Sequence, residues 1–264
     1  MNNIFVKEMS DIKSLKDREV ILISGLPGVA NIGKFAIDTI IETKKPEHIL
    51  EIHSPYLPPL VIPDENNVIK MTSNSIYYLK REEEKDILLW TGDFQPVSAE
   101  GMGQFILARE IFEYLKNIFK IEFILTLGGY GTGKTVHDGK VYGAVSDISV
   151  KEKLMSSGAT FEKDVPPGGI AGMNGLILGF GAIYSIPSGC IMGETSGYIP
   201  DPASSINVIK ILSSFLSMDI DLTALNEKAE EMKVIIKDLD LNNVHKKYGE
   251  GEYVKSKSHL NYIG

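Results

Sequence analysis

A glycine-rich segment that ends in a lysine and a threonine is the most conspicuous chemical pattern in the sequence. Residues Gly128 to Thr135 read GGYGTGKT and satisfy the phosphate-loop pattern letter for letter. In such a loop the backbone N–H groups cradle phosphates, the lysine contacts the β and γ oxygens, and the hydroxyl residue holds magnesium. The pattern therefore raises one possible function, a P-loop nucleotide-binding protein or hydrolase that uses Lys134 and Thr135.

The residues that follow Lys134 argue against this function. A phosphate loop requires a helix that begins at the lysine, but Asp138 and Gly139 lie between valines and are typical of a hairpin turn. A second segment, Gly28 to Lys34, has the same glycine spacing, yet Phe35 stands where the magnesium-binding hydroxyl must be. We therefore predict glycine-rich turns at both places and keep nucleotide binding as the alternative.

Other candidates for chemistry have a structural interpretation that is favoured over the functional one. Cys190 lies in an apolar run without the spacing of a nucleophile elbow, so we predict a small buried side chain. The five histidines show none of the spacings typical of metal ligands. Asp93, Glu194 and Asp201 each follow a strand-like run, where we expect them to cap helices or stabilise turns. The sequence thus predicts no catalytic residue, metal site or cofactor.

The elements that must position these residues alternate between buried strands and amphipathic helices, which predicts an α/β fold. Strands are predicted at residues 20–24, 87–90, 121–127, 141–145 and 190–192, and helices at 30–42, 101–119, 149–157, 173–184 and 203–218. Residues 54–63 contain four prolines, so we expect a surface loop there, followed by a hairpin of residues 68–71 and 76–80.

Composition narrows the class of protein and its partners. The chain has 264 residues and a formal net charge of −8, which opposes binding to nucleic acid because each neutralised phosphate requires a cation. Its single cysteine and the absence of a signal-peptide pattern at the start predict a cytoplasmic protein. Residues 165–193 carry no charge, but their prolines, glycines and acidic flanks favour a buried helix and strand over a membrane span.

The C-terminal part begins with a regular apolar stripe and ends in a polar tail. The stripe recurs at spacings of three and four residues, and we expect it to be buried either on its own domain or against a partner subunit. Its members are Leu222, Leu225, Ala229, Met232, Ile236 and Leu239. We predict three parts: an α/β core over 1–220, an amphipathic helix over 221–240 that begins at Asp221, and a flexible tail over 241–264.

The order of several short motifs resembles that of one family. The fragments span about residues 20 to 240, and their order and spacing resemble the proteasome assembly chaperone family in its archaeal branch. They are Gly25 to Gly28 with Asn31 to Lys34, Trp90 to Pro96, Gly128 to Gly133, Gly172 to Leu176, Gly193 to Thr195 and Pro200 to Ala203.

This resemblance implies a non-enzymatic, ATP-independent protein whose α/β fold is similar to that of nucleoside phosphorylases. Such a fold has three layers, with a mostly parallel sheet and flanking helices. The resemblance also implies homo-oligomers or hetero-oligomers with a homologue, and binding to proteasome α subunits.

Some members of that family dock through a C-terminal tail that ends in a hydrophobic residue, a tyrosine and any residue. Here the chain ends in Leu260, Asn261, Tyr262, Ile263 and Gly264, so the tyrosine is third from the end rather than second. A shift of one residue moves the carboxylate by about 3.3–3.6 Å relative to the ring. Three alternatives follow: docking in an altered register, action through a partner, or a tail that binds nothing.

Overall fold

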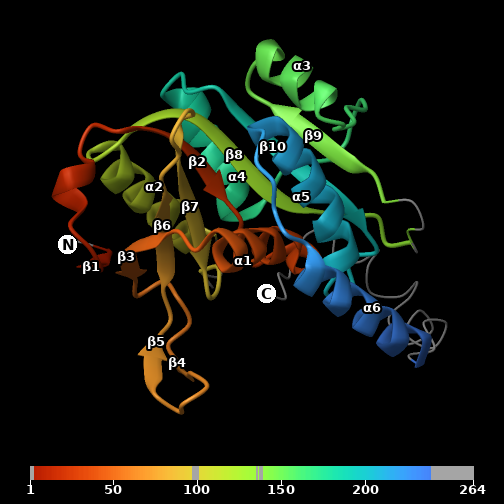
Figure 1. The fold of residues 1–264 in the computed structure, drawn as a ribbon, viewed down its shortest axis with the longest axis horizontal. Helices are drawn as coiled ribbons and strands as arrows, with labels where there is room; N and C mark the ends of the chain where they lie inside the picture. The colour runs from red at the N-terminus through yellow and green to blue at the C-terminus, as the bar shows by residue number, and fades with distance from the viewer. Residues whose placement is uncertain (1–2, 97–100, 135, 137–138, 239–264) are drawn as a thin grey trace.

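A computed structural model describes residues 3–96, 101–134, 136 and 139–238. An eight-stranded mixed sheet in the order β1-β3-β6-β7-β2-β8-β10-β9 forms its centre (Figure 1). Its strands are β1 (Phe5–Glu8), β2 (Glu19–Ser24), β3 (Glu47–His53), β6 (Asn74–Leu79), β7 (Asp86–Gly92), β8 (Lys120–Gly131), β9 (Val141–Val145) and β10 (Ser188–Thr195).

Four neighbouring strands are parallel, and the strands on either side of them are antiparallel to their neighbours. β7, β2, β8 and β10 pair in parallel in that order, whereas β1, β3 and β6 on one side and β9 on the other form antiparallel pairs. Parallel strands are covered on both faces and therefore read as continuous apolar runs. β7 follows this rule, since every residue from Asp86 to Gly92 is buried.

Helices cover both faces of the sheet, so the predicted three-layer α/β fold is confirmed. One apolar core lies between the sheet and helices α2 (Met102–Lys116) and α4 (Gly172–Ile183). A second core lies on the opposite face beneath α1 (Ile32–Lys44), α3 (Ile148–Ser156) and α5 (Pro202–Leu216) (Figure 1). Two 3₁₀ turns, η1 (Ile12–Leu15) and η2 (Val29–Asn31), precede β2 and α1.

The apolar stripe near the C-terminus begins in the chain's own core. Helix α6 (Thr223–Asp238) packs against α5, and the N–H of Thr223 donates to Asp221 at 2.9 Å, where we predicted the start of the helix. Leu225 and Ala229 are buried in the second core, with Leu222 packed against it. The first alternative, burial on the same domain, therefore holds for these residues. Met232 is half-buried, while the side chain of Ile236 and all of Leu239 lie outside the described part.

The predicted hairpin of residues 68–71 and 76–80 is wrong. Strand β5 (Ile69–Met71) pairs instead with β4 (Val61–Pro63), and β6 joins the main sheet between β3 and β7. The proline-rich segment was expected to be loop only, but it supplies β4, because a short ribbon with open edges tolerates Pro63. This two-stranded ribbon projects away from the body of the molecule (Figure 1).

The uncharged segment 165–193 forms a helix and a strand of the α/β core, as predicted. It supplies α4 and most of β10, which lies between β8 and the edge strand β9 in the sheet. Among the described residues, no helix combines the length and apolar character that crossing a membrane requires.

Candidate functional site

The segment Gly128 to Thr135 does not have the conformation of a phosphate loop. Strand β8 continues to Gly131, and none of the described residues between β8 and β9 is helical. The N–H groups of Thr132 and Gly133 donate to the carbonyls of Thr195 and Ser196 at 2.9 and 3.2 Å. These donors are therefore engaged by the end of β10 rather than free to cradle a phosphate, and Thr135 lies outside the described residues.

The chain reverses direction after this segment, but the predicted hairpin does not form. Strand β10 lies between β8 and β9 and pairs with both of them, in parallel with β8 and antiparallel with β9. β8 and β9 are therefore not hydrogen-bonded to each other, as the two strands of a hairpin would be. Of the Asp138-Gly139 pair, Asp138 lies outside the described residues. β10, which comes later in the chain than both strands, occupies the position next to β8 that β9 would occupy in a hairpin.

The first glycine segment joins β2 to α1 by close backbone packing. A Cβ atom at Gly33 would lie 2.1 Å from the carbonyl oxygen of Leu127 in β8, so only glycine fits there. The Lys34 ammonium binds Asp38 one turn along the same helix, at 2.5 Å. The segment thus serves to bring α1 against the sheet, as the turn interpretation predicts.

Four segments of the chain meet at the carboxyl edge, by which we mean the edge where β7, β2, β8 and β10 end. The Gln95 side chain donates through Nε2 to the Pro27 carbonyl at 2.5 Å and accepts through Oε1 from the Met173 N–H at 3.0 Å. It therefore joins the loop after β7 to the loop after β2 and to the first turn of α4.

Asn174 makes a second set of links at the same edge. Its Oδ1 accepts from the Ser24 hydroxyl at 3.0 Å, and its Nδ2 donates to the Leu127 carbonyl at 2.8 Å. Together with the Gln95 contacts, these bonds form the carboxyl-edge network. Because the amide groups of both side chains bond to protein groups, the network serves to fix the loops.

Of the three carboxylates expected to cap helices or stabilise turns, Asp201 and Asp93 do so, whereas Glu194 lies inside β10 and contacts the segment before β9. Asp201 accepts from the Ser204 N–H at 2.9 Å and caps α5, as predicted. Asp93 accepts from the Ser73 N–H at 3.0 Å and pairs with Lys70 at 3.1 Å. Glu194 accepts from the Lys140 N–H at 3.3 Å.

The comparisons with known proteins agree with this architecture. The PAC2 family model matches residues 22–240. This chain belongs to the PAC2 family. The protein MJ1210 of Methanocaldococcus jannaschii, described as uncharacterized, is 32% identical over 275 residues that cover 100% of this chain and 99% of that protein.

Solved structures of the same fold cover nearly the whole chain. PbaB of Pyrococcus furiosus, described as an archaeal proteasome activator, has a TM-score of 0.82 and 27% identity, and the match covers 91% of this chain and 100% of PbaB. PbaA of the same organism, described as an archaeal homolog of proteasome-assembly chaperone, has a TM-score of 0.73 and 22% identity, with 93% and 96% covered. The match to PbaA shows the fold alone.

The motif fragments that resemble the proteasome assembly chaperones lie at the carboxyl edge of this PAC2 fold. They form the ends of β7, β8 and β10, the loops that follow the parallel strands, and the first turns of α1, α4 and α5. Gln95 and Asn174 belong to these fragments, but the residues alone do not predict their roles. Only their positions within the ordered motifs mark Gln95 and Asn174 as candidate functional residues.

The single cysteine of this PAC2 protein is buried in β10, as predicted. Burial raises the pKa of the Cys190 thiol to about 12, because the thiolate is disfavoured away from water. Among the histidines, burial lowers the pKa of His48, whose ring donates through Nε2 to the Leu50 carbonyl at 3.0 Å. Among the described residues, no group of three acidic, histidine or cysteine side chains is placed to hold a metal ion.

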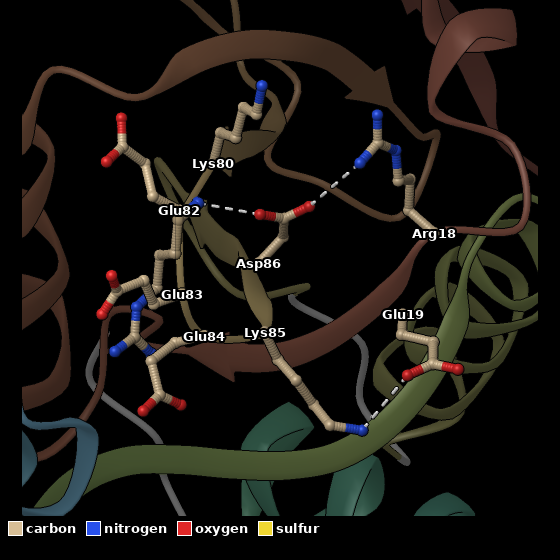
Figure 2. Close-up of a pocket in the computed structure, with 9 residues that line it drawn as sticks. Arg18, Glu19, Lys80, Glu82, Glu83, Glu84, Lys85 and Asp86 are labelled. Carbon is tan, nitrogen blue, oxygen red and sulfur yellow. Dashed lines mark hydrogen bonds and ion pairs between the residues drawn. The ribbon is translucent and has the colours of Figure 1, made fainter.

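Two open pockets lie at opposite ends of the parallel strands. One of about 610 Å³ lies at the carboxyl edge, lined by Tyr130, Tyr142, Lys134 and Glu194 among others. The other, of about 740 Å³, lies at the β6–β7 turn and is lined mainly by charged side chains (Figure 2). There Asp86 accepts from the Arg81 N–H at 2.8 Å and lies 4.0 Å from Arg18, so its carboxylate is engaged within the turn.

The predicted partner-binding residues of the tail lie outside the described part of the chain. They are Leu260, Tyr262, Ile263 and Gly264. Their docking role therefore stays a prediction, as does a subunit interface made by Met232, Ile236 and Leu239. Leu222 and Leu225 pack instead in the second core of their own chain.

Proposed function

We propose that this protein is a chaperone or scaffold without enzymatic activity that acts in proteasome assembly by binding proteasome α subunits. One observation carries the proposal: the chain belongs to the PAC2 family over residues 22–240 and is 27% identical to PbaB, an archaeal proteasome activator, across nearly the whole of both chains. The same relatives support an archaeal origin. The cytoplasm, which contains proteasomes, is the corresponding site of action.

The contact with α subunits is proposed to be made by the C-terminal tail. A tail that presents a terminal carboxylate beside an aromatic ring provides a charged group and a rigid anchor together. In this chain Tyr262 and the carboxylate of Gly264 would provide them, with Leu260 and Ile263 as apolar contacts. Binding occurs either by the chain alone or in a hetero-oligomer with a homologue, and it requires no nucleotide.

Copurification with archaeal proteasome α subunits tests the proposal. We expect the full chain to associate in the absence of ATP, and Tyr262→Ala to weaken association by about tenfold through loss of an aromatic anchor. Tyr253→Ala, also in the tail, is the matched control and is expected to bind as the unchanged chain does. The proposal fails when the full chain does not associate with α subunits, either alone or together with a PAC2 homologue.

The position of the tyrosine has its own test. Deletion of Gly264 places Tyr262 second from the end, as in the tails of the family. We expect this variant to bind at least as tightly as the full chain if the tail docks through both ring and carboxylate. Weaker binding would mean that the longer ending is itself the recognised form.

A further inference from the structure

The pocket of about 610 Å³ at the carboxyl edge places a carboxylate beside two tyrosines, and we call it the tyrosine pocket. Tyr130 in β8 is the register partner of Glu194 in β10. Two residues before Glu194, Met192 is the register partner of Tyr142 in β9. Side chains alternate along a strand and register partners share a face, so Tyr130, Tyr142 and Glu194 lie on one face of the sheet.

The two tyrosine rings meet at a corner. Their centroids are 5.2 Å apart and their planes are inclined at 82°. Tyr142 is only 6% exposed, and among the described residues its hydroxyl has no hydrogen-bond partner. Desolvation and, after it, the charges of Glu194 and Glu162 raise the pKa of Tyr142, so the hydroxyl stays protonated at neutral pH. Buried tyrosines normally bond their hydroxyl groups, and this one is therefore left for a ligand.

The carboxylate of Glu194 lacks a counter-ion. On the wall of the pocket, the Lys140 ammonium pairs with Glu162 at 3.0 Å, so these two charges cancel. Glu194 is partly buried and accepts only from the Lys140 backbone N–H, at 3.3 Å. Within the described part of the chain, no cation lies within ion-pair distance of it. Since a carboxylate withdrawn from water needs a partner, the pocket favours a ligand that is a cation.

A single lysine at the rim supplies the opposite charge. Lys134 also lines the tyrosine pocket and is exposed, and no described acidic residue lies within ion-pair distance of its ammonium group. The pocket thus presents an unpaired negative charge beside the rings and an unpaired positive charge at its opening. A ligand complementary to both carries a cation at one end and an anion at the other.

The groups around Glu194 select the type of cation. They are hydrogen-bond acceptors and aromatic rings, and the ring of Tyr142 already lies 6.0 Å from the Lys140 ammonium. A guanidinium group has five donors and no acceptor, binds a carboxylate through two parallel bonds and stacks on aromatic rings. Val165 and Pro167 add apolar surface along which a methylene chain can lie.

We infer that the tyrosine pocket binds arginine, either as the free amino acid or as the C-terminal residue of a peptide. Its guanidinium group bonds to Glu194 between the tyrosine rings, and its α-carboxylate pairs with Lys134. Both sources present the same two groups. The inference concerns binding without a chemical step and is independent of the proposed contact with α subunits.

Titration calorimetry of the full chain with a set of small ligands tests the inference. We expect L-arginine to give saturable heat. L-citrulline has the same shape without the charge and should bind at least about tenfold more weakly, because a charged hydrogen bond is lost. Agmatine lacks the carboxylate and should bind about threefold more weakly, since the pair with Lys134 is exposed. The tripeptide Gly-Gly-Arg distinguishes the two sources: tighter binding than arginine indicates a chain terminus, and weaker binding indicates the free amino acid.

Variants assign each contact. Glu194→Gln should weaken arginine binding by at least about tenfold, and Tyr142→Phe by about fivefold through loss of one hydroxyl. Lys134→Ala should weaken the binding of arginine but leave that of agmatine unchanged, which no general loss of structure would do. Glu83→Gln, in the charged pocket at the other end of the parallel strands, is the matched control and should bind as the unchanged chain does.

Three results would overturn the inference. They are the absence of binding by both arginine and Gly-Gly-Arg up to about 10 mM, equal binding of citrulline and arginine, and unchanged arginine binding by Glu194→Gln. Circular dichroism verifies that each variant is folded, and Tyr142→Phe repeats the comparison if Glu194→Gln is not.

Discussion

The side-chain oxygen of Gln95 accepts a hydrogen bond from the backbone N–H of Met173 at 3.0 Å, although the two residues are 78 positions apart in the sequence. The bond satisfies an N–H group in the first turn of α4, where helices have no internal acceptor. With the bond from Gln95 to the Pro27 carbonyl, it makes one side chain the link between three segments.

Removal of the Gln95 amide is therefore expected to destabilise the protein. Gln95→Ala leaves the Met173 N–H and the Pro27 carbonyl without their partner, and we expect a loss of about 1–3 kcal/mol in the free energy of unfolding. Urea denaturation followed by circular dichroism measures it. An exposed glutamate at the other end of the sheet, Glu83, provides the control, and equal stability of Gln95→Ala and Glu83→Ala would contradict the linking role.

Two glycines of one motif are expected to respond differently to alanine. At Gly33 the added methyl group would lie 2.1 Å from the backbone oxygen of Leu127, so α1 or β8 must move, at about 3 kcal/mol or more. At Gly28 an added Cβ atom would have its nearest neighbour, Nε2 of Gln95, at 3.6 Å, and the backbone φ of −172° suits any residue. Thermal unfolding should show a large loss for Gly33→Ala and a loss below about 1 kcal/mol for Gly28→Ala. Similar stabilities would contradict the packing described for α1.

Deprotonation of Tyr78 is expected to destabilise the folded protein at alkaline pH. Burial, followed by the hydrogen bond that its hydroxyl donates to Asp86, raises its pKa from 10.0 to about 12. The folded state thus holds this proton more tightly than the unfolded state does, so the contribution is complete below pH 10 and is lost as the pH rises towards 12.

Replacement by phenylalanine isolates this contribution. Tyr78→Phe should lower the free energy of unfolding at neutral pH, because Asp86 loses a donor, but should weaken the decline between pH 10 and 12 by on the order of 2 kcal/mol. Urea denaturation at a series of pH values gives both quantities. An identical decline in the two proteins would mean that Tyr78 does not titrate in that interval.

Nucleotide binding at Gly128 to Thr135 is expected to be absent, because the Thr132 and Gly133 N–H groups bond to residues at and after the end of β10. Titration calorimetry with ATP and magnesium should give no heat of binding, and Lys134→Ala should behave identically. Heat that disappears in Lys134→Ala, with Lys34→Ala unchanged, would restore the phosphate-loop interpretation.

The elements that could be predicted from the sequence are those whose pattern is local. β2, β7 and β8 are apolar runs, and α2 and α5 have helical periodicity, so each is identifiable without its neighbours. β3 was missed, because its register and place between β1 and β6 come from contacts with distant residues. The Asp138-Gly139 signal failed for the same reason, since β10 pairs with β9 in place of β8.

The candidate site was predictable in part. The structural roles of Asp93, Asp201 and Cys190 follow from their positions after or within strands, and the structure confirms them. The roles of Gln95 and Asn174 depend on which loops meet in space, and no spacing along the chain reveals this. The exposed apolar side chains of Val61, Ile69 and Met71 on one face of the ribbon were also missed, because their proximity depends on the pairing of β4 with β5.

The anchoring of the ribbon by Asp93 has a consequence for recognition. One carboxylate binds the Lys70 ammonium in β5 and the Ser73 backbone at the entry to β6, so the ribbon is tied to the sheet at its base. A surface that is anchored in this way has less conformational freedom to lose when a partner binds. Binding to such a surface costs little conformational entropy. A small apolar face can therefore bind a partner more tightly than a flexible loop of the same composition.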